Sequence, residues 1–529
     1  MNRVALGLFV GVLALSSQGH ASAAEEPATF ALEEASIGNL QRRMTAGELT
    51  AHAIVQQYLD RIAAIDTAGP SLRAVIELNP DALKIADQLD AERKNGKVRG
   101  PLHGIPVLIK DNIETADAMH TSAGSLALAG SIAAQDSTVA ANLRAAGAVI
   151  LGKTNLSEWA NFRSSHSSSG WSGRGGQTRN PYALNRNPCG SSSGTGAAVS
   201  ANLAAAGIGS ETDGSIVCPA ATNGIVGIKP TLGLVSRAGI IPIAHSQDTA
   251  GTMARSVADA AVLLSAIAGA DARDATSAMG ETHRSDYTRY LDANALHGAR
   301  IGVVRKLAGF SPDVDALLAK NIEALKGAGA IVVDPVELPN LGKYDDAELI
   351  VLEYEFKHDL DIYLSGLPSA AGAPRSLAEM IRYNERERVR EMPWFDQDLF
   401  EKSQARGPLS DKVYRDALAR EKLLAGRQGI DAALKRHKLD GLIAPTGGPS
   451  WVTDWINGDH TAGGSSTPAA VAGYPDITVP AGFVHGLPIG LSFFAGAWSE
   501  PKLIGLAYAF EQSARARQPP KFLPVIDTP

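Results

Sequence analysis

Short apolar runs alternate with helical patterns along most of this chain, and this alternation is the feature that most restricts its fold. Runs of three to five residues are typical of strands that are buried on both faces of a parallel or mixed sheet. The predicted strands are 105–109, 148–151, 224–228, 301–304, 330–333, 441–444 and 477–479. The sequence therefore predicts an α/β fold with helices on both faces of a large central sheet.

Local helix signals support the same layout. The capping-box spacing of Thr45 and Glu48 predicts the start of a helix that extends to Ile62. Asp136 or Ser137 can cap a helix that stops at Gly147. Further helices are predicted over 80–94, 257–268 and 317–327. The charged segment from Ala272 to Lys438 is less regular, and we interpret it as an elaboration beside or over the site within a single domain spanning 24–529.

Composition excludes some classes of function. The chain has 529 residues, of which 45% are hydrophobic and 20% are charged, so it can build a large core. Its formal net charge of -7 argues against a nucleic-acid partner, which usually requires a basic surface.

The first residues have the pattern of a secretory signal peptide. Arg3 precedes an apolar run from Val4 to Leu15, and Ala21-Ser22-Ala23 forms a small-residue cleavage site. We predict a signal peptide over 1–23, a periplasmic or secreted protein, and no stable membrane insertion after cleavage. An uncleaved membrane anchor is the main alternative.

The stretch from Cys189 to Pro219 contains two segments dense in Gly and Ser, 190–196 and 209–215, which we predict to be loops. Such loops can present hydroxyl and backbone N–H groups to a ligand, although most are simply flexible. The two cysteines, Cys189 and Cys218, flank this stretch. They can form a disulfide or remain two small buried side chains, and the sequence leaves both possibilities open.

Several motifs occur in the order and spacing of one enzyme family. They are Gly104-Ile105-Pro106 through Lys110-Asp111, Gly152-Lys153-Thr154-Asn155 with Glu158, Gly190-Ser191-Ser192-Ser193-Gly194, Asp213-Gly214-Ser215, Gly227-Ile228-Lys229-Pro230-Thr231, and Asp248-Thr249-Ala250-Gly251 with Arg255 and Asp259. On these motifs the chain resembles the amidase signature family of serine hydrolases over roughly Ser36 to Gln512. It looks most like the peptide amidase branch. The resemblance implies an α/β/α sandwich with a large mixed sheet.

The resemblance also implies a catalytic triad. Lys110 matches the catalytic lysine of the family, Ser215 matches the nucleophile, and Ser191 matches a bridging serine that follows a non-proline cis peptide bond. Backbone N–H groups would hold the oxyanion, and the matching positions are Thr212, Asp213, Gly214 and Ser215.

This triad is chemically reasonable on its own terms. A serine hydroxyl is a weak nucleophile until a base takes its proton. A lysine can act as that base only when it is uncharged, which burial in a core favours. Such a mechanism needs no metal and no organic cofactor.

Other polar residues have structural interpretations. Lys153 and Asn155 are expected to position loops, and Asp248, Arg255 and Asp259 are expected to form pairs or caps. A histidine triad is disfavoured, because no G-x-S-x-G motif surrounds Ser215.

The function predicted from these observations is an exported hydrolase that converts C-terminal carboxamides of peptides into acids and ammonia. The alternatives are a broad aliphatic or aryl amidase of the same family, an amidotransferase A-type subunit, and a non-catalytic periplasmic binding protein. The expected partner is a small-molecule or peptide amide, and the expected state is a monomer or homodimer.

Overall fold

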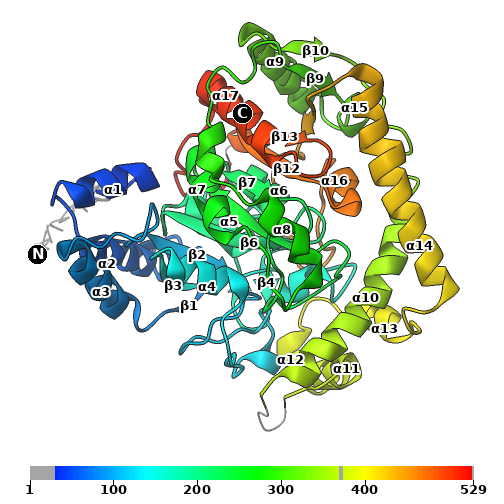
Figure 1. Ribbon diagram of the computed structural model, residues 1–529. Coiled ribbons are helices and arrows are strands. Elements are labelled where there is room, and N and C mark those ends of the chain that lie inside the picture. The colour runs from blue at the N-terminus through cyan, green and yellow to red at the C-terminus, as the bar shows by residue number, and fades with distance from the viewer. Residues whose placement is uncertain (1–29, 369–372, 527–529) are drawn as a thin grey trace, which may run out of the picture.

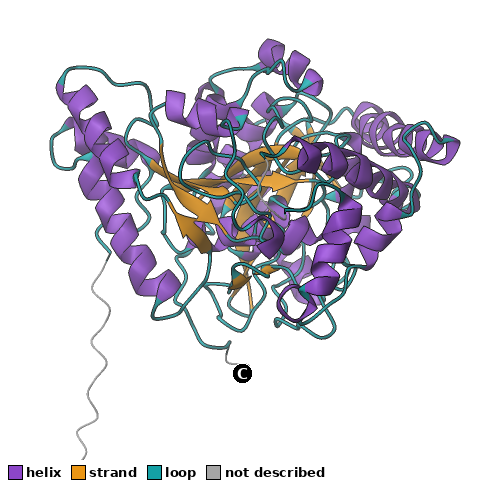
Figure 2. Ribbon diagram, turned by 90° about the horizontal axis from the view of Figure 1, so that it is seen from below, coloured by secondary structure: helices purple, strands orange, loops and turns teal. Residues whose placement is uncertain are grey.

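The computed structural model describes residues 30–368 and 373–526. The predicted signal peptide, 1–23, lies outside the described residues, so export stays a prediction. A large mixed sheet crosses the molecule and has helices on both faces (Figures 1 and 2).

The central sheet has eleven strands. In spatial order they are β1 (Val75–Leu78), β3 (Val149–Thr154), β2 (Pro106–Lys110), β6 (Ala206–Glu211), β8 (Thr249–Ala254), β7 (Val226–Lys229), β12 (Asp476–Val484), β13 (Leu487–Phe494), β11 (Gly441–Pro445), β9 (Arg300–Val303) and β10 (Ile331–Val333). Strand β2 is parallel to β3 and β6, and β9 is parallel to β10 and β11. The other pairings within this sheet are antiparallel. The strands β4 (Trp171–Ser172) and β5 (Gly176–Gln177) form a separate ribbon.

The helices surround this sheet. They are α1 (Ile37–Thr45), α2 (Ala51–Arg61), α3 (Ala82–Lys94), α4 (Thr138–Ala145), α5 (Ser193–Ser200), α6 (Val217–Thr222), α7 (Val257–Ile267), α8 (Gly280–His283), α9 (Pro312–Gly327), α10 (Asp345–Gly366), α11 (Leu377–Arg386), α12 (Arg388–Glu391), α13 (Asp398–Gln404), α14 (Lys412–Lys422), α15 (Asp431–His437), α16 (Thr467–Ala472) and α17 (Glu500–Ala514). None of these described helices combines the length and apolar composition that a membrane crossing requires.

Different helices pack against the two faces of the sheet, and neighbouring side chains of one strand contact different helices. Met253 of β8 packs with Val199 of α5 and Ala220 of α6. Its neighbour Ala254 instead joins the main core, which also contains the apolar face of α7. Successive side chains of a strand point to opposite faces, so α5 and α6 cover one face and α7 covers the other.

The predicted mixed α/β fold is confirmed, and every predicted strand is present with its ends shifted by a few residues. Ser137 caps α4, and Gly147 follows this helix with a positive φ of 82°, as expected. The capping-box prediction is wrong, because Thr45 ends α1 and Thr50 caps α2 by accepting a hydrogen bond from the Ala53 N–H.

The two predicted loops are also partly wrong. Helix α5 begins at Ser193, inside the segment 190–196, and strand β6 continues to Glu211, inside the segment 209–215. Glycine in these elements reflects close packing: a Cβ on Gly207 would lie 2.6 Å from the Thr195 methyl group.

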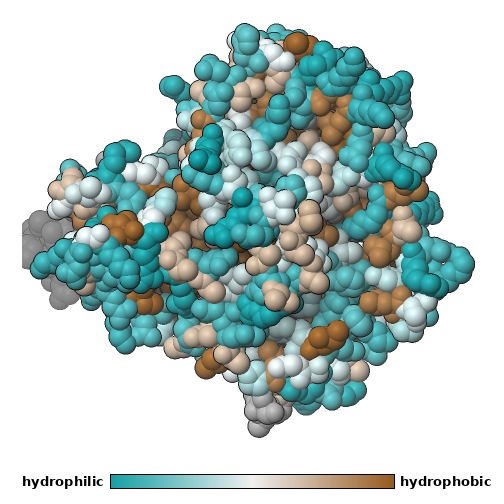
Figure 3. Space-filling model, in the orientation of Figure 1, coloured by the Kyte–Doolittle hydropathy of each residue, from teal (hydrophilic) through white to brown (hydrophobic). Residues whose placement is uncertain are grey.

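The segment 272–438 contributes both to the sheet and to an outer layer. Strands β9 and β10 extend one edge of the sheet, whereas α10, α13 and α14 lie on the right in Figure 1. Phe400 of α13 packs against Trp159 and against Phe356 of α10, with ring centroids 5.8 Å and 5.2 Å apart. Polar residues dominate the surface in this view, and apolar residues form separate patches (Figure 3).

Candidate active site

Lys110 occupies the last position of β2, in the middle of the described core. All five residues of this strand are buried, and Lys110 has 0% of its surface exposed. Its Nζ donates hydrogen bonds to Ser191 Oγ at 2.7 Å, to Ser210 Oγ at 3.0 Å and to the Ser210 carbonyl at 3.1 Å. The end of β2 therefore places the Lys110 amine within hydrogen-bond distance of two serine hydroxyls.

The surroundings of Lys110 favour its neutral form. Burial lowers the pKa of Lys110 to about 7, because the ammonium loses its hydration. The carboxylates of Asp248 and Glu211 oppose this shift but do not cancel it. Near pH 7 a substantial fraction of this amine is therefore free to accept a proton.

Ser191 lies two residues before the start of α5. The Gly190-Ser191 peptide bond is cis. A Cβ at Gly190 would overlap the hydroxyls of Ser157 and Ser169, so only glycine has room here. Ser192 continues the segment and donates its Oγ–H to the Ser210 carbonyl at 3.1 Å.

Ser215 lies in the turn between β6 and α6. The Ser192 N–H donates to the Ser215 carbonyl at 3.1 Å, so the two serine segments are joined through their backbones. Gly214 has a φ of 79°, which suits glycine. The Glu211 carboxylate accepts from the N–H groups of Ile216 and Val217, at 2.6 Å and 3.0 Å.

Four backbone N–H groups in this turn have no internal partner. Within the described part of the chain, those of residues 212–215 donate no hydrogen bond. Buried N–H groups are rarely left unpaired in proteins, and successive free donors in a turn form a site for negative charge. The turn can therefore receive an oxyanion beside the Ser215 hydroxyl.

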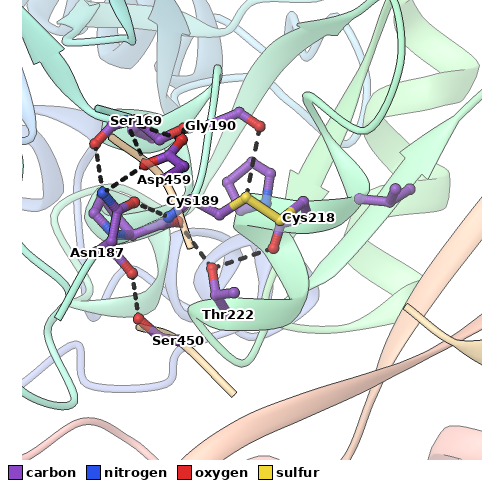
Figure 4. The surroundings of a disulfide bond; sticks show 12 residues. Ser169, Asn187, Cys189, Gly190, Cys218, Thr222, Ser450 and Asp459 are labelled. Atoms are coloured by element: carbon purple, nitrogen blue, oxygen red, sulfur yellow. Dashed lines mark hydrogen bonds between the residues drawn. A yellow bond between two sulfur atoms is a disulfide. The ribbon is translucent and has the colours of Figure 1, made fainter. Parts of the chain in front are cut away.

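The disulfide question is resolved by the structure. Cys189 and Cys218 are bonded, with their Cα atoms 6.0 Å apart (Figure 4). Cys189 lies two residues before Ser191, and Cys218 lies three residues after Ser215. The bond thus joins the two serine segments covalently.

Two cavities flank these serines. The first, the isoleucine-lined pocket, has a volume of about 200 Å³, contains Ser191, Ser210 and Thr212 in its wall, and is lined by Ile240, Ile241 and Ile243. The second, the glycine-lined pocket, has a volume of about 270 Å³. Its wall contains the disulfide and the glycines Gly190, Gly214, Gly447, Gly448, Gly463 and Gly464.

A comparison with known protein families agrees with this geometry. The family model described as Amidase matches residues 53–504. The chain belongs to the amidase family. It is therefore a hydrolase of amide C–N bonds, as the sequence predicted.

Individual relatives of this amidase cover nearly its whole length. The crystal structure of native peptide amidase from Stenotrophomonas maltophilia superposes with a TM-score of 0.88 and 55% identity, covering 93% of this chain and 100% of that one. A probable amidase of Arabidopsis thaliana is 42% identical over 522 residues, covering 96% of each chain. The A-type subunit of the glutamyl-tRNA(Gln) amidotransferase of Synechococcus sp. (strain JA-3-3Ab) is 34% identical over 514 residues, covering 93% of this chain and 95% of that one.

Other polar residues of this amidase hold its loops. Lys153 is buried and donates to the Thr121 hydroxyl at 3.0 Å, and Asn155 donates to the Gly176 carbonyl at 3.0 Å. Arg255 donates to the carbonyls of Ala35 and Ala204, and the Asp259 carboxylate accepts from the Ile37 N–H. These contacts match the structural roles that were predicted.

Two histidines close to the motifs in sequence, His103 and His166, have other partners. His103 is buried, and its Nε2 is 2.9 Å from the Leu89 carbonyl. His166 contacts Ser164 and Ser165 in an exposed turn. Neither contacts Lys110, Ser191 or Ser215 through a hydrogen bond.

Sequence reasoning missed the role of Ser210, and it expected only a structural pair or cap at Asp248. The hydroxyls of Ser210 and Ser191 both accept hydrogen bonds from Lys110. The alternation of side chains along a strand places Ser210 on the side of β6 that faces Lys110. Asp248 accepts from the Thr212 hydroxyl at 2.6 Å and from the N–H groups of Ile243 and Ala244 at 2.8 Å and 2.9 Å. Burial raises the pKa of Asp248 to about 6. Only the pairing of β6 with β8 brings these residues together.

Proposed function

We propose that this amidase is an exported enzyme that hydrolyses the C-terminal carboxamides of peptides, using Ser215 as nucleophile, Ser191 as proton relay and Lys110 as base. The observation that carries the proposal is the 2.7 Å hydrogen bond from buried Lys110 to Ser191, next to the segment that holds Ser215. Similarity to a peptide amidase at 55% identity supports the substrate class.

The first half of the reaction forms an acyl-enzyme. Neutral Lys110 accepts the proton of Ser191 Oγ, and Ser191 takes the proton of Ser215 Oγ, which attacks the amide carbonyl carbon. The C=O bond becomes a C–O⁻ single bond, and the free N–H groups of residues 212–215 stabilise this charge.

The second half releases the products. The tetrahedral intermediate collapses, its C–N bond breaks, and the proton held by Lys110 returns through Ser191 to the departing nitrogen, which leaves as ammonia. Water then attacks the ester at Ser215, with the same pair of residues taking and returning its proton. The balance is one amide and one water for one carboxylic acid and one ammonia.

Export rests on the pattern in residues 1–23, and a disulfide next to the site is consistent with an oxidising compartment. Mass spectrometry of the protein recovered from the periplasm or medium tests this part. A mature chain that begins at Ala24 is expected, and an intact Met1 in a cell-associated protein would contradict it.

The test of the reaction is ammonia release from a C-terminally amidated peptide, with its internal bonds followed by mass spectrometry and Ser215→Ala as the control. We expect release of ammonia with all internal bonds intact, and no release by the control. Hydrolysis of simple aliphatic or aryl amides only would retain the mechanism and reject the peptide substrate. Glutamine hydrolysis that requires partner chains would instead indicate an amidotransferase.

A further inference from the structure

The ionisable side chains in the wall of the glycine-lined pocket are all acidic. Its ionisable wall residues are Asp213 and Asp459, and no lysine, arginine or histidine of the described chain lines it. The isoleucine-lined pocket differs, because Arg237, Arg273 and His245 stand in its wall beside the carboxylates. A ligand that enters the glycine-lined pocket therefore meets two acids without a compensating cation.

Both carboxylates are held in place. The Asp459 carboxylate accepts from the Ser169 N–H at 2.9 Å, from the Ser169 hydroxyl at 2.5 Å and from Asn187 Nδ2 at 3.3 Å (Figure 4). Asp213 accepts from the Thr467 hydroxyl at 2.7 Å through Oδ2. Their positions are thus fixed before a ligand arrives, which strengthens their effect on it.

The pocket wall also offers acceptors that nothing in the protein uses. Asp213 Oδ1 and Asn161 Oδ1 are buried and have no hydrogen-bond partner among the described residues. The side-chain amide of Asn161 donates to the Ser169 hydroxyl at 2.9 Å, so its carbonyl oxygen can still accept from another donor. Unpaired buried acceptors are costly, and a ligand with N–H donors or a positive charge would satisfy them.

Neighbouring cations do not neutralise the two acids. His460 follows Asp459, but its side chain is 55% exposed and pairs with Asp454 at 3.3 Å. Lys229 interacts electrostatically with Asp213, but also with the buried carboxyl groups of Glu211 and Asp476. Burial and the neighbouring carboxylate of Asp345 on α10 both raise the pKa of Asp213.

We propose that the glycine-lined pocket selects substrates by charge: it receives the residue that carries the carboxamide, accepts neutral or cationic side chains there, and rejects carboxylates. The inference rests on the proposed function, because it places the acyl part of the peptide amide beside Gly190 and Gly214. It also bears on turnover, since hydrolysis converts a neutral carboxamide into a carboxylate that this pocket repels.

The test compares three peptide amides that differ only in the last side chain: acetyl-Ala-Lys-NH₂, acetyl-Ala-Met-NH₂ and acetyl-Ala-Glu-NH₂. We expect kcat/KM for the lysine amide to exceed that for the glutamate amide by about tenfold or more at low salt, with the methionine amide between them. The ratio should shrink as salt screens the charges.

Asp459→Asn is the informative variant, because it removes the charge and keeps the acceptor for Ser169. It should narrow the lysine-to-glutamate ratio several-fold, even if overall activity falls. Asp416→Asn, which removes an exposed carboxylate of α14 outside the pocket wall, is the control and should leave the ratio at the wild-type value.

Equal rates for the three amides, preference for the glutamate amide, or the same ratio in Asp459→Asn would overturn the inference. Binding of the same amides to the Ser215→Ala protein by calorimetry separates it from the proposed function. If no amide is hydrolysed, the proposed reaction fails, and the order of the three dissociation constants still decides the charge preference.

Discussion

Two buried lysines stand on neighbouring strands, and they do different things. Lys110 ends β2, Lys153 lies in β3, and the residue before Lys110 is paired with Lys153 in the parallel ladder. Burial lowers both pKa values, to about 7 for Lys110 and about 8 for Lys153. Lys110 is therefore the more easily deprotonated of the two lysines.

The difference follows from the charges around each ammonium. Two carboxylates, Asp248 and Glu211, act on Lys110, whereas Asp111, Asp117, Glu77 and Glu114 all act on Lys153. Lys153 also donates to the Ile113 carbonyl. A buried lysine with many carboxylates is a structural cation, and one with hydroxyl partners and few carboxylates is available as a base.

Lys110→Met should produce the largest effect on catalysis. The variant keeps an apolar side chain of similar length in the core but cannot accept a proton, so kcat/KM for a peptide amide should fall by about a thousandfold or more. Steady-state ammonia release measures this. Wild-type activity in the variant would remove Lys110 from the mechanism.

Lys153→Met should affect stability instead. It leaves the Ile113 carbonyl and the nearby carboxylates without their cation, and we expect the free energy of unfolding to fall by about 3 kcal/mol. Denaturant titration measures the loss in the free energy of unfolding, and ammonia release measures the activity of the protein that remains folded. A thousandfold loss of kcat/KM in fully folded Lys153→Met would abolish the distinction between the two lysines.

Asp248→Asn should move the pH profile. Because only neutral Lys110 acts as base, kcat/KM should rise with pH and level off above about 7. Asp248 raises the pKa of Lys110, so its removal should shift this limb to lower pH, with a plateau lowered by less than about tenfold. An unchanged or upward-shifted limb would show that another group controls the profile.

Ser210→Ala should have the smallest effect. It removes one of the two hydroxyls that accept from Lys110 and leaves Ser191 and the Ser210 carbonyl in place. We expect kcat/KM to fall by less than about tenfold, since a neutral hydrogen bond contributes about 1 kcal/mol and the second bond lost, from Asn112, does not involve the proposed triad. Ser191→Ala is the comparison. A larger loss of kcat/KM in Ser210→Ala than in Ser191→Ala would contradict the assignment of the proton relay to Ser191.

The sequence predicted much of the fold because apolar strands such as Ile105–Ile109 are self-evident. It missed β6, β8 and α5, whose sequences AGIGSE, TAGTMA and SGTGAAVS consist mostly of Gly, Ala, Ser and Thr. These elements pack so closely that a Cβ on Gly194 would overlap the carbonyls of Ala74 and Asn155. Glycine was interpreted as a loop signal where it is a packing requirement.

The candidate site also contains residues that the sequence could predict and residues that it could not. Lys110, Ser191 and Ser215 belong to sequence motifs, so their roles could be predicted and await the tests above. Asp459 comes from a loop that has no motif and reaches Ser169 across 290 positions of the chain. Only tertiary structure could place such a carboxylate beside Gly190.

The disulfide described above adds a covalent link between the segments of Ser191 and Ser215. Where thiols are kept reduced, the segments of Ser191 and Ser215 are joined only by weaker contacts, such as the Ser192–Ser215 backbone hydrogen bond. Oxidation of Cys189 and Cys218 then completes the link. Under the export that we propose, this covalent link would form only after the chain has left the reducing cytoplasm.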